Sequence, residues 1–111
     1  MSDPGPSIFP LDDRLFCLSL IDWSESIAEL FDQQGLQGGG YTWLGIAEAL
    51  LELHNPALSD SFEVFDAEGD NMYAYSTSKD MLEEFAELLR RAMVDRAFLL
   101  AAMKHAGDEL E

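Results

Sequence analysis

Two alternating stretches near the middle of the chain constrain the fold most. Residues 61–67 and 71–77 each alternate apolar or aromatic side chains with polar ones, which is the period of a β-strand. The three residues between them, 68–70, have the sequence Glu-Gly-Asp and favour a turn. The pair therefore predicts a β-hairpin. In its first strand, strict alternation places Phe62 and Val64 on one face.

The remaining segments predict one more strand and four helices. Residues 14–21 form a short, almost wholly apolar run, which is typical of a strand covered on both faces. Apolar side chains at helical spacing predict helices elsewhere, and residues favoured as N-caps begin the first three of them. These helices run from Asp22 to about Gln34, from Thr42 to about His54, from Ser78 to about Met93, and from about Asp95 through His105.

Together these elements predict a single α+β domain over residues 1–111. The expected order is β-α-α-β-β-α-α, with a small, mainly antiparallel sheet of three strands and about four helices packed on it. Residues 1–10 contain three prolines and are expected to form an extended lead-in, and residues 107–111 a frayed tail. With 48% hydrophobic residues, the chain has enough apolar side chains for a real core, in which we expect Trp43 to be buried.

Negative charge is concentrated in the first two thirds of the chain. The net charge is −16, and residues 1–78 contain fourteen acidic side chains but one basic one, Arg14. Such a surface steers positively charged partners. It disfavours nucleic acids and anionic membranes, which both select for Lys and Arg. No secretory signal or membrane-spanning run is visible in the sequence, so we expect a cytoplasmic protein.

Residues that could carry chemistry are few. His54 and His105 are each expected near a helix C-terminus, where a protonated imidazole suits the helix dipole. Cys17 lies in an apolar run and is expected to be a buried, unreactive thiol. One cysteine and two distant histidines do not provide the spacing of a zinc site. We therefore expect no catalytic residue, no bound metal and no cofactor.

Two loops resemble ligand-binding motifs but fail their tests. The glycine-rich run 35–40 lacks the Lys-Ser/Thr ending of a phosphate loop and follows a helix, so it predicts a helix–helix turn. Its glycines are expected to let Tyr41 and Trp43 approach the sheet. In the run that begins at Asp66, Gly69 is at the fourth position and not at the sixth, where a calcium loop requires it, and Thr77 occupies the twelfth position, where the loop requires a glutamate. We therefore interpret the run as a turn with a solvated acidic tip.

The acidic and aromatic side chains expected at the surface are best explained by binding to a partner protein. The candidate acids have no cation close in sequence and lie on the outer faces of the first two helices and on the hairpin. They are Glu29, Asp32, Glu48, Glu52, Asp66, Glu68 and Asp70. Tyr73 and Tyr75 alternate on one strand face, where they either pack under a helix or are half exposed to a partner.

The segment 38–47, with the sequence GGGYTWLGIA, is similar to a known family. Together with the helix at Ile27–Phe31, the hairpin at Phe62–Tyr75 and the closing helices, it resembles immunity protein 51 of bacterial polymorphic-toxin systems. The resemblance runs from about Arg14 to Ala106. It implies a small cytoplasmic protein that binds and neutralises a cognate toxin domain, and it supplies no catalytic residues.

Alternatives to an immunity protein stay open at this stage. An acidic adaptor or chaperone-like module for another basic protein would have the same charge and the same exposed aromatics. A small enzyme or ligand-binding domain would need a cleft with convergent polar groups and perturbed pKa values. A binder of a basic toxin would instead present a continuous acidic face with exposed aromatic side chains.

Overall fold

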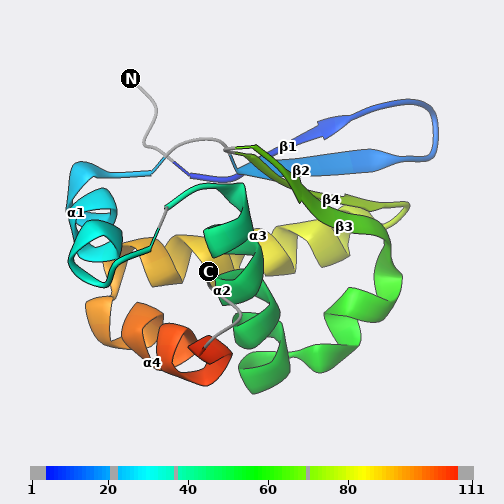
Figure 1. Cartoon of the computed structure of the whole chain (residues 1–111). Helices are drawn as coiled ribbons and strands as arrows, with labels where there is room; N and C mark the ends of the chain where they lie inside the picture. The colour runs from blue at the N-terminus through cyan, green and yellow to red at the C-terminus, as the bar shows by residue number, and fades with distance from the viewer. Residues whose placement is uncertain (1–4, 21–22, 37, 70, 108–111) are drawn as a thin grey trace.

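The computed structural model describes residues 5–20, 23–36, 38–69 and 71–107, and in it the elements follow the order β-β-α-α-β-β-α-α (Figure 1). The strands are β1 (Ser7–Pro10), β2 (Phe16–Leu20), β3 (Phe62–Glu68) and β4 (Asn71–Ser76). The helices are α1 (Glu25–Gln33), α2 (Gly40–His54), α3 (Lys79–Val94) and α4 (Arg96–Ala106), with a 3-10 helix, η1 (Pro56–Ser61), between α2 and β3. The α+β class is confirmed.

The four strands form one antiparallel sheet in the spatial order β1-β2-β4-β3. The expected sheet had three strands, but β1 pairs with β2 instead of forming an unpaired lead-in. Pro10 is tolerated because β1 is an edge strand, where a missing N–H removes no ladder bond. Asp12 closes the β1–β2 turn by accepting hydrogen bonds from the backbone N–H groups of Arg14 (2.8 Å) and Leu15 (2.9 Å). These bonds favour the ionised carboxylate and lower the pKa of Asp12.

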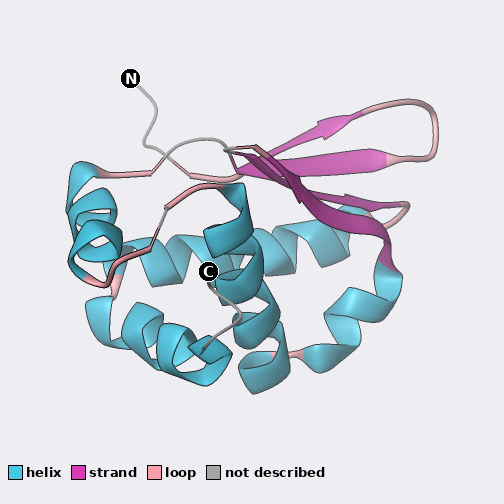
Figure 2. Cartoon of the chain, viewed as in Figure 1, coloured by secondary structure: helices cyan, strands magenta, loops and turns pink. Residues whose placement is uncertain are grey.

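The helices α2 and α3 pack on one face of the sheet, and α4 packs against both of them (Figure 2). The strand residues that face these helices are fully buried: Leu18 and Leu20 from β2, and Met72 and Ala74 from β4. They join the helix stripes in one core. In the described part of the chain no helix covers the opposite face of the sheet (Figure 1). The fold therefore has two layers, with the sheet as its outer wall.

A β-bulge near the start of β3 changes which side chains face the helices. The pairing of β3 with β4 shifts between Phe62 and Val64. Phe62 and Phe65 consequently both face α3, where their rings contact Phe85 at centroid distances of 5.1 and 5.6 Å. The expectation that Phe62 and Val64 share a face is wrong, because strict alternation does not allow for the extra residue.

The glycine-rich turn brings the start of α2 directly against the hairpin. Gly40 donates its backbone N–H to the carbonyl oxygen of Gly69 in the β3–β4 turn (3.1 Å). A side chain at Gly40 would overlap the backbone of Asn71. Gly38 has a φ of +77°, which other residues rarely adopt. The expected helix–helix turn is confirmed, and it is the backbone of α2 that approaches the sheet.

Two details at this turn differ from expectation. Tyr41 is 59% exposed and does not pack on the sheet, whereas Trp43 is fully buried as expected. Thr42 is not the N-cap of α2, because the helix already begins at Gly40, with Gly39 as its cap. The Thr42 hydroxyl oxygen instead accepts a hydrogen bond from the backbone N–H of Gly38 (3.1 Å). The two extra helical residues are Gly40 and Tyr41, and the helix start was missed because helix propensity disfavours glycine.

Side-chain caps set the starts of α3 and α4, whereas the N-cap of α1, Ser24, makes no side-chain cap hydrogen bond. Ser78 caps α3 by accepting the N–H of Met81 (3.3 Å), as predicted. Asp95 caps α4 by accepting the N–H of Phe98 (3.1 Å), and this cap accounts for the break between α3 and α4. The expected cap of α1, Asp22, lies outside the described residues. The helix begins at Glu25, after Ser24.

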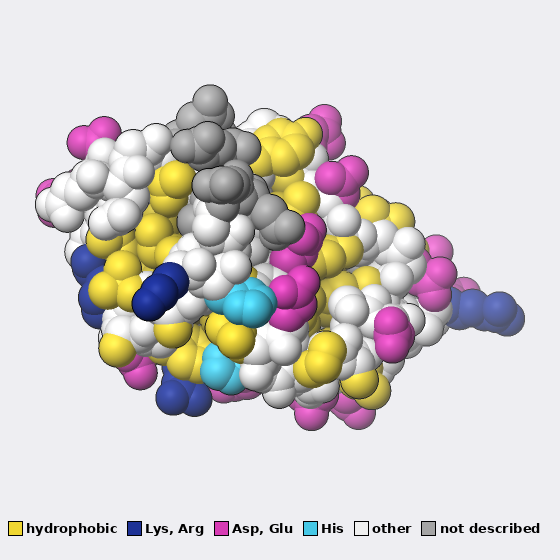
Figure 3. Space-filling model, turned by 60° about the horizontal axis from the view of Figure 1, so that its bottom comes forward, with side chains coloured by type: hydrophobic (Ala, Val, Ile, Leu, Met, Phe, Trp, Pro, Cys, Tyr) yellow, Lys and Arg dark blue, Asp and Glu magenta, His cyan; other side chains and the backbone are white. Residues whose placement is uncertain are grey.

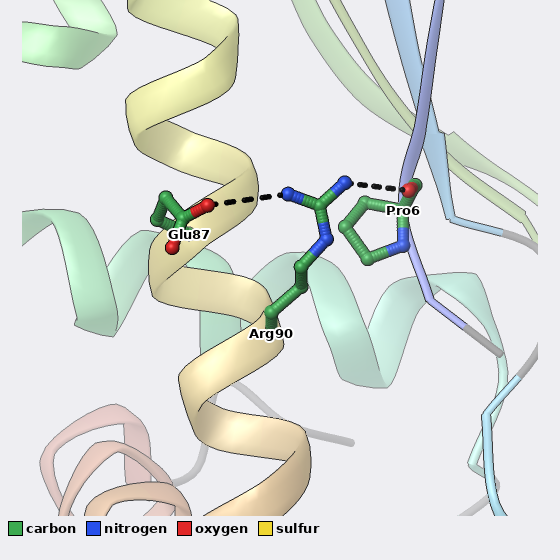
Figure 4. A network of polar contacts seen from close by, with 3 residues as sticks. All are labelled: Pro6, Glu87 and Arg90. Atoms are coloured by element: carbon green, nitrogen blue, oxygen red, sulfur yellow. Dashed lines mark hydrogen bonds and ion pairs between the residues drawn. The ribbon is translucent and has the colours of Figure 1, made fainter. Parts of the chain in front are cut away.

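An arginine of α3 ties the start of β1 to the helical layer (Figure 4). Arg90 donates a hydrogen bond to the backbone carbonyl of Pro6 (3.4 Å) and another to the carboxylate of Glu87 (3.5 Å). Pro6 is itself buried. Arg90 therefore helps to position β1, the edge strand that makes the sheet four-stranded.

Candidate binding surface

The sheet face that no described helix covers is the candidate binding surface, and we call it the open face. In antiparallel strands, directly opposite residues point to the same side, so the strand register defines its rows. The first row, across all four strands, is Phe9, Cys17, Tyr75 and Val64. The second row is Ser7, Ser19, Tyr73 and Asp66. A third, shorter row is Asn71 and Glu68.

The open face is apolar and aromatic at its centre. Tyr73 and Tyr75 are half-buried on it, so of the two alternatives left by the sequence, half exposure holds and packing under a helix does not. The amide nitrogen of Asn71 donates to the hydroxyl of Tyr73 (3.0 Å) and orients that ring. Phe9 and Val64, at the two ends of the first row, are 42% and 44% exposed.

The charges on the strands are all negative. Asp66 and Glu68 of β3 are exposed, and their positions lie opposite Tyr73 and Asn71. Asp70 lies outside the described residues. None of the four strands contains a Lys or Arg. The register thus brings four predicted binding residues together on the open face, namely Asp66, Glu68, Tyr73 and Tyr75.

The other predicted acids lie on helices, away from the open face. Glu29 and Asp32 are exposed on α1, which lies at the opposite end of the molecule from the projecting β1–β2 hairpin (Figure 1). Glu48 and Glu52 of α2 line a hollow of about 260 Å³ on the helical side, whose other walls are Leu51, Pro56, Ser59 and Phe65. Ligand pockets for small molecules typically span ≈ 300–1,000 Å³, so this hollow is small for one.

Glu52 has a partner that sequence spacing did not predict. Its carboxylate oxygen lies 2.8 Å from Nε2 of His105, because α4 packs against α2. His105 lies 53 residues from Glu52 in the sequence, so the prediction that Glu52 has no cation close in sequence holds, but the fold places an imidazole beside its carboxylate. Figure 3 shows acidic side chains beside the histidines near the middle of this side, and several Lys and Arg side chains towards one edge.

A cation–aromatic cluster beside this pair was also missed from the sequence. The ring of His54 stacks on the ring of Phe98 at a centroid distance of 4.6 Å. The guanidinium carbon of Arg91 lies 4.2 Å from the centroid of the Phe98 ring. The three residues come from three different helices, so no local sequence pattern predicts the cluster. As expected, both histidines lie at or near helix C-termini: His54 ends α2, and His105 is in the last turn of α4.

The single thiol lies beneath the open face. Cys17 is 2% exposed, and burial raises the pKa of its thiol above the ordinary value. Such a group is protonated at neutral pH and is a poor nucleophile. Cys17 instead fills space beneath the open face, where it packs between its first-row neighbours Phe9 and Tyr75.

The described residues contain no group of three or more His, Cys, Asp or Glu side chains placed to hold a metal ion. None of their helices has both the length and the apolar character needed to cross a bilayer.

The fold and this surface define a class: a small α+β domain that presents tyrosines and carboxylates on the uncovered side of an antiparallel sheet. The chain belongs to the immunity protein 51 family, whose sequence model matches residues 8–108. The resemblance seen in the sequence is thereby confirmed. Searches of curated proteins and of solved structures found no match. Membership implies a cognate toxin as partner and, as is typical of immunity proteins, inhibition without catalysis.

Proposed function

We propose that this protein binds a cognate bacterial toxin domain through its acidic surface and neutralises it by occupying that domain, without catalysis. The observation that carries the proposal is the family match, which spans almost the whole described chain. The partner is a basic protein. Toxins that act on nucleic acids present Lys and Arg to the phosphate backbone, and an acidic protein can cover the same surface.

The distribution of charge supports a basic partner. Five of the six Lys and Arg residues belong to α3 and α4, whereas the sheet, α1 and α2 contain none. Opposite charge on a partner accelerates association, because the long-range field steers the two proteins together. Fast capture suits a cell that synthesises the toxin itself.

The first test uses the cognate toxin domain, to be sought in the genes that neighbour the one for this protein. We expect co-expression to restore the growth of cells that produce the domain, and the purified proteins to form a complex. The association rate should fall roughly tenfold or more between about 20 mM and about 500 mM salt, because screening weakens steering. Absence of both rescue and binding would overturn the proposed function. Binding with a salt-independent association rate would overturn the role of the acidic surface but not toxin binding itself.

A charge-reversal pair locates the acids that matter. The variant Asp66→Lys with Glu68→Lys changes two exposed carboxylates on the open face. The control, Glu83→Lys with Glu84→Lys, makes the same change of charge on exposed positions of α3. We expect the first pair to slow association several-fold more than the control. Equal effects would mean that only net charge matters.

A further inference from the structure

The open face has a composition that the fold itself does not require. In an antiparallel sheet with one solvated side, the solvated side is ordinarily polar. Here Phe9, Tyr75 and Val64 form a row across strands β1, β4 and β3, with Cys17 beneath them. Phe9 and Val64 expose 42% and 44% of their surface. These side chains therefore add apolar area on the side away from the core.

The arrangement matches the anatomy of a protein interface. Interfaces typically combine a central apolar and aromatic patch with a polar rim, and tyrosine is enriched at their centres. On the open face, Tyr73 and Tyr75 lie on the central strand β4, while Asp66 and Glu68 lie on the edge strand β3. An aromatic centre next to a carboxylate rim favours a protein partner over a small molecule.

The charge of the rim identifies the kind of partner. No Lys or Arg is present on any of the four strands, and the strand acids are Glu63, Asp66 and Glu68. A second copy of this chain would bring like charges together at the edge. A partner that presents an apolar group flanked by Lys or Arg is complementary to both parts of the face.

We infer that the open face is the surface on which the toxin domain docks, with the row Phe9–Cys17–Tyr75–Val64 as its apolar part and Asp66 and Glu68 of β3 as its acidic part. This inference rests on the proposed function and adds the location and chemistry of the contact. Strand β1 is part of the surface, since it supplies Phe9 and pairs with Cys17 of β2. The hollow on α2 and the acids of α1 then lie outside the contact.

The test compares two double variants with matched exposure. Phe9→Thr with Val64→Thr removes apolar groups from the open face and keeps residues that favour strands. Leu53→Gln with Leu100→Gln is the control, because these leucines on α2 and α4 are 44% and 40% exposed and Gln favours helix. Dissociation constants for the purified toxin domain are measured by calorimetry, and thermal midpoints verify folding.

We expect the open-face variant to bind at least about tenfold more weakly, and the helical variant to bind within about twofold of the wild type. Wild-type affinity for a folded open-face variant would overturn the inference, as would an equal loss in the helical variant. In either case the wild type still binds, so the proposed function stands. Sedimentation of the free protein adds a further outcome: a dimer that the open-face variant disrupts would assign this face to self-association and overturn the inference.

Discussion

At the scale of single residues, Trp43 is the largest fully buried side chain among the described residues. It is fully buried on α2, and its ring meets Trp23 and Phe31 at centroid distances of 5.8 and 5.6 Å. Within the described residues its indole N–H has no hydrogen-bond partner. The side chain therefore stabilises the protein by packing alone.

Trp43→Ala should lower the free energy of unfolding by ~3–5 kcal/mol, because it removes buried area and leaves a cavity. Trp43→Phe is the control: it keeps an aromatic ring and deletes the unpartnered N–H, so it should cost less than half as much. Chemical denaturation measures both. If Trp43→Ala keeps the wild-type stability but loses toxin binding, the residue is a contact and its structural role is wrong.

Cys17 makes the stability of the protein depend on pH in the alkaline range. Its thiol pKa is raised by burial, so above the ordinary value of 9.0 the unfolded state loses this proton before the folded state does. The folded state then binds more protons, and stability must fall as pH rises. Cys17→Ala should flatten this part of the stability–pH curve. A thiol reagent at pH 8 should react many-fold more slowly with the native protein than with the denatured one; equal rates would contradict the burial.

At the scale of elements, β1 depends on a contact with α3. Arg90→Met removes the hydrogen bond to the carbonyl of Pro6, so amide exchange at residues 7–9 of β1 should become several-fold faster. Global stability should change by less than about 1 kcal/mol, because the arginine is largely exposed. The control is Arg96→Met, an exposed change on α4. Exchange in β1 that responds equally to both variants would show that Arg90 does not position the strand.

The helices were predictable because their apolar spacing is a local property of the sequence. Ile27, Leu30 and Phe31 are buried on one side of α1, as their spacing predicts. Strand β1 was missed because Pro10 within it, and Pro4 and Pro6 just before it in the sequence, argue against a strand unless its place at the sheet edge is known. The bulge in β3 was missed because a single extra residue leaves no trace in an alternating pattern.

The candidate binding surface was predictable only in part, for a related reason. Tyr73 and Tyr75 share a face because they are two residues apart on one strand, and the sequence states this directly. That Phe9 and Val64 join the same row follows from pairings between distant segments, Phe9 with Cys17 and Val64 with Tyr75. Likewise, the contact between Glu52 and His105 depends on how two helices pack.

At the scale of the whole molecule, net charge opposes folding. The formal charge of −16 lies on only 111 residues, and repulsion among the acids weakens the compact state. Added NaCl should therefore raise the thermal midpoint, with most of the rise complete by about 0.3 M, where the screening length falls to only several ångströms. Scanning calorimetry over a salt series measures this. A midpoint that is flat or falls with salt would mean that the charges are already compensated locally.

The strand order β1-β2-β4-β3 has a consequence for the time at which the protein becomes active. Strand β2 ends at Leu20, but its partner β4 begins only at Asn71, after two helices and another strand have been synthesised. Such long-range pairing closes late, because the intervening chain must first be brought together. A ribosome must therefore translate beyond Ser76 before the four-strand surface can exist. With the open face as the proposed docking surface, a chain cannot bind the toxin before Ser76 of its 111 residues has been translated, and a premature stop before β4 yields a fragment that lacks this surface.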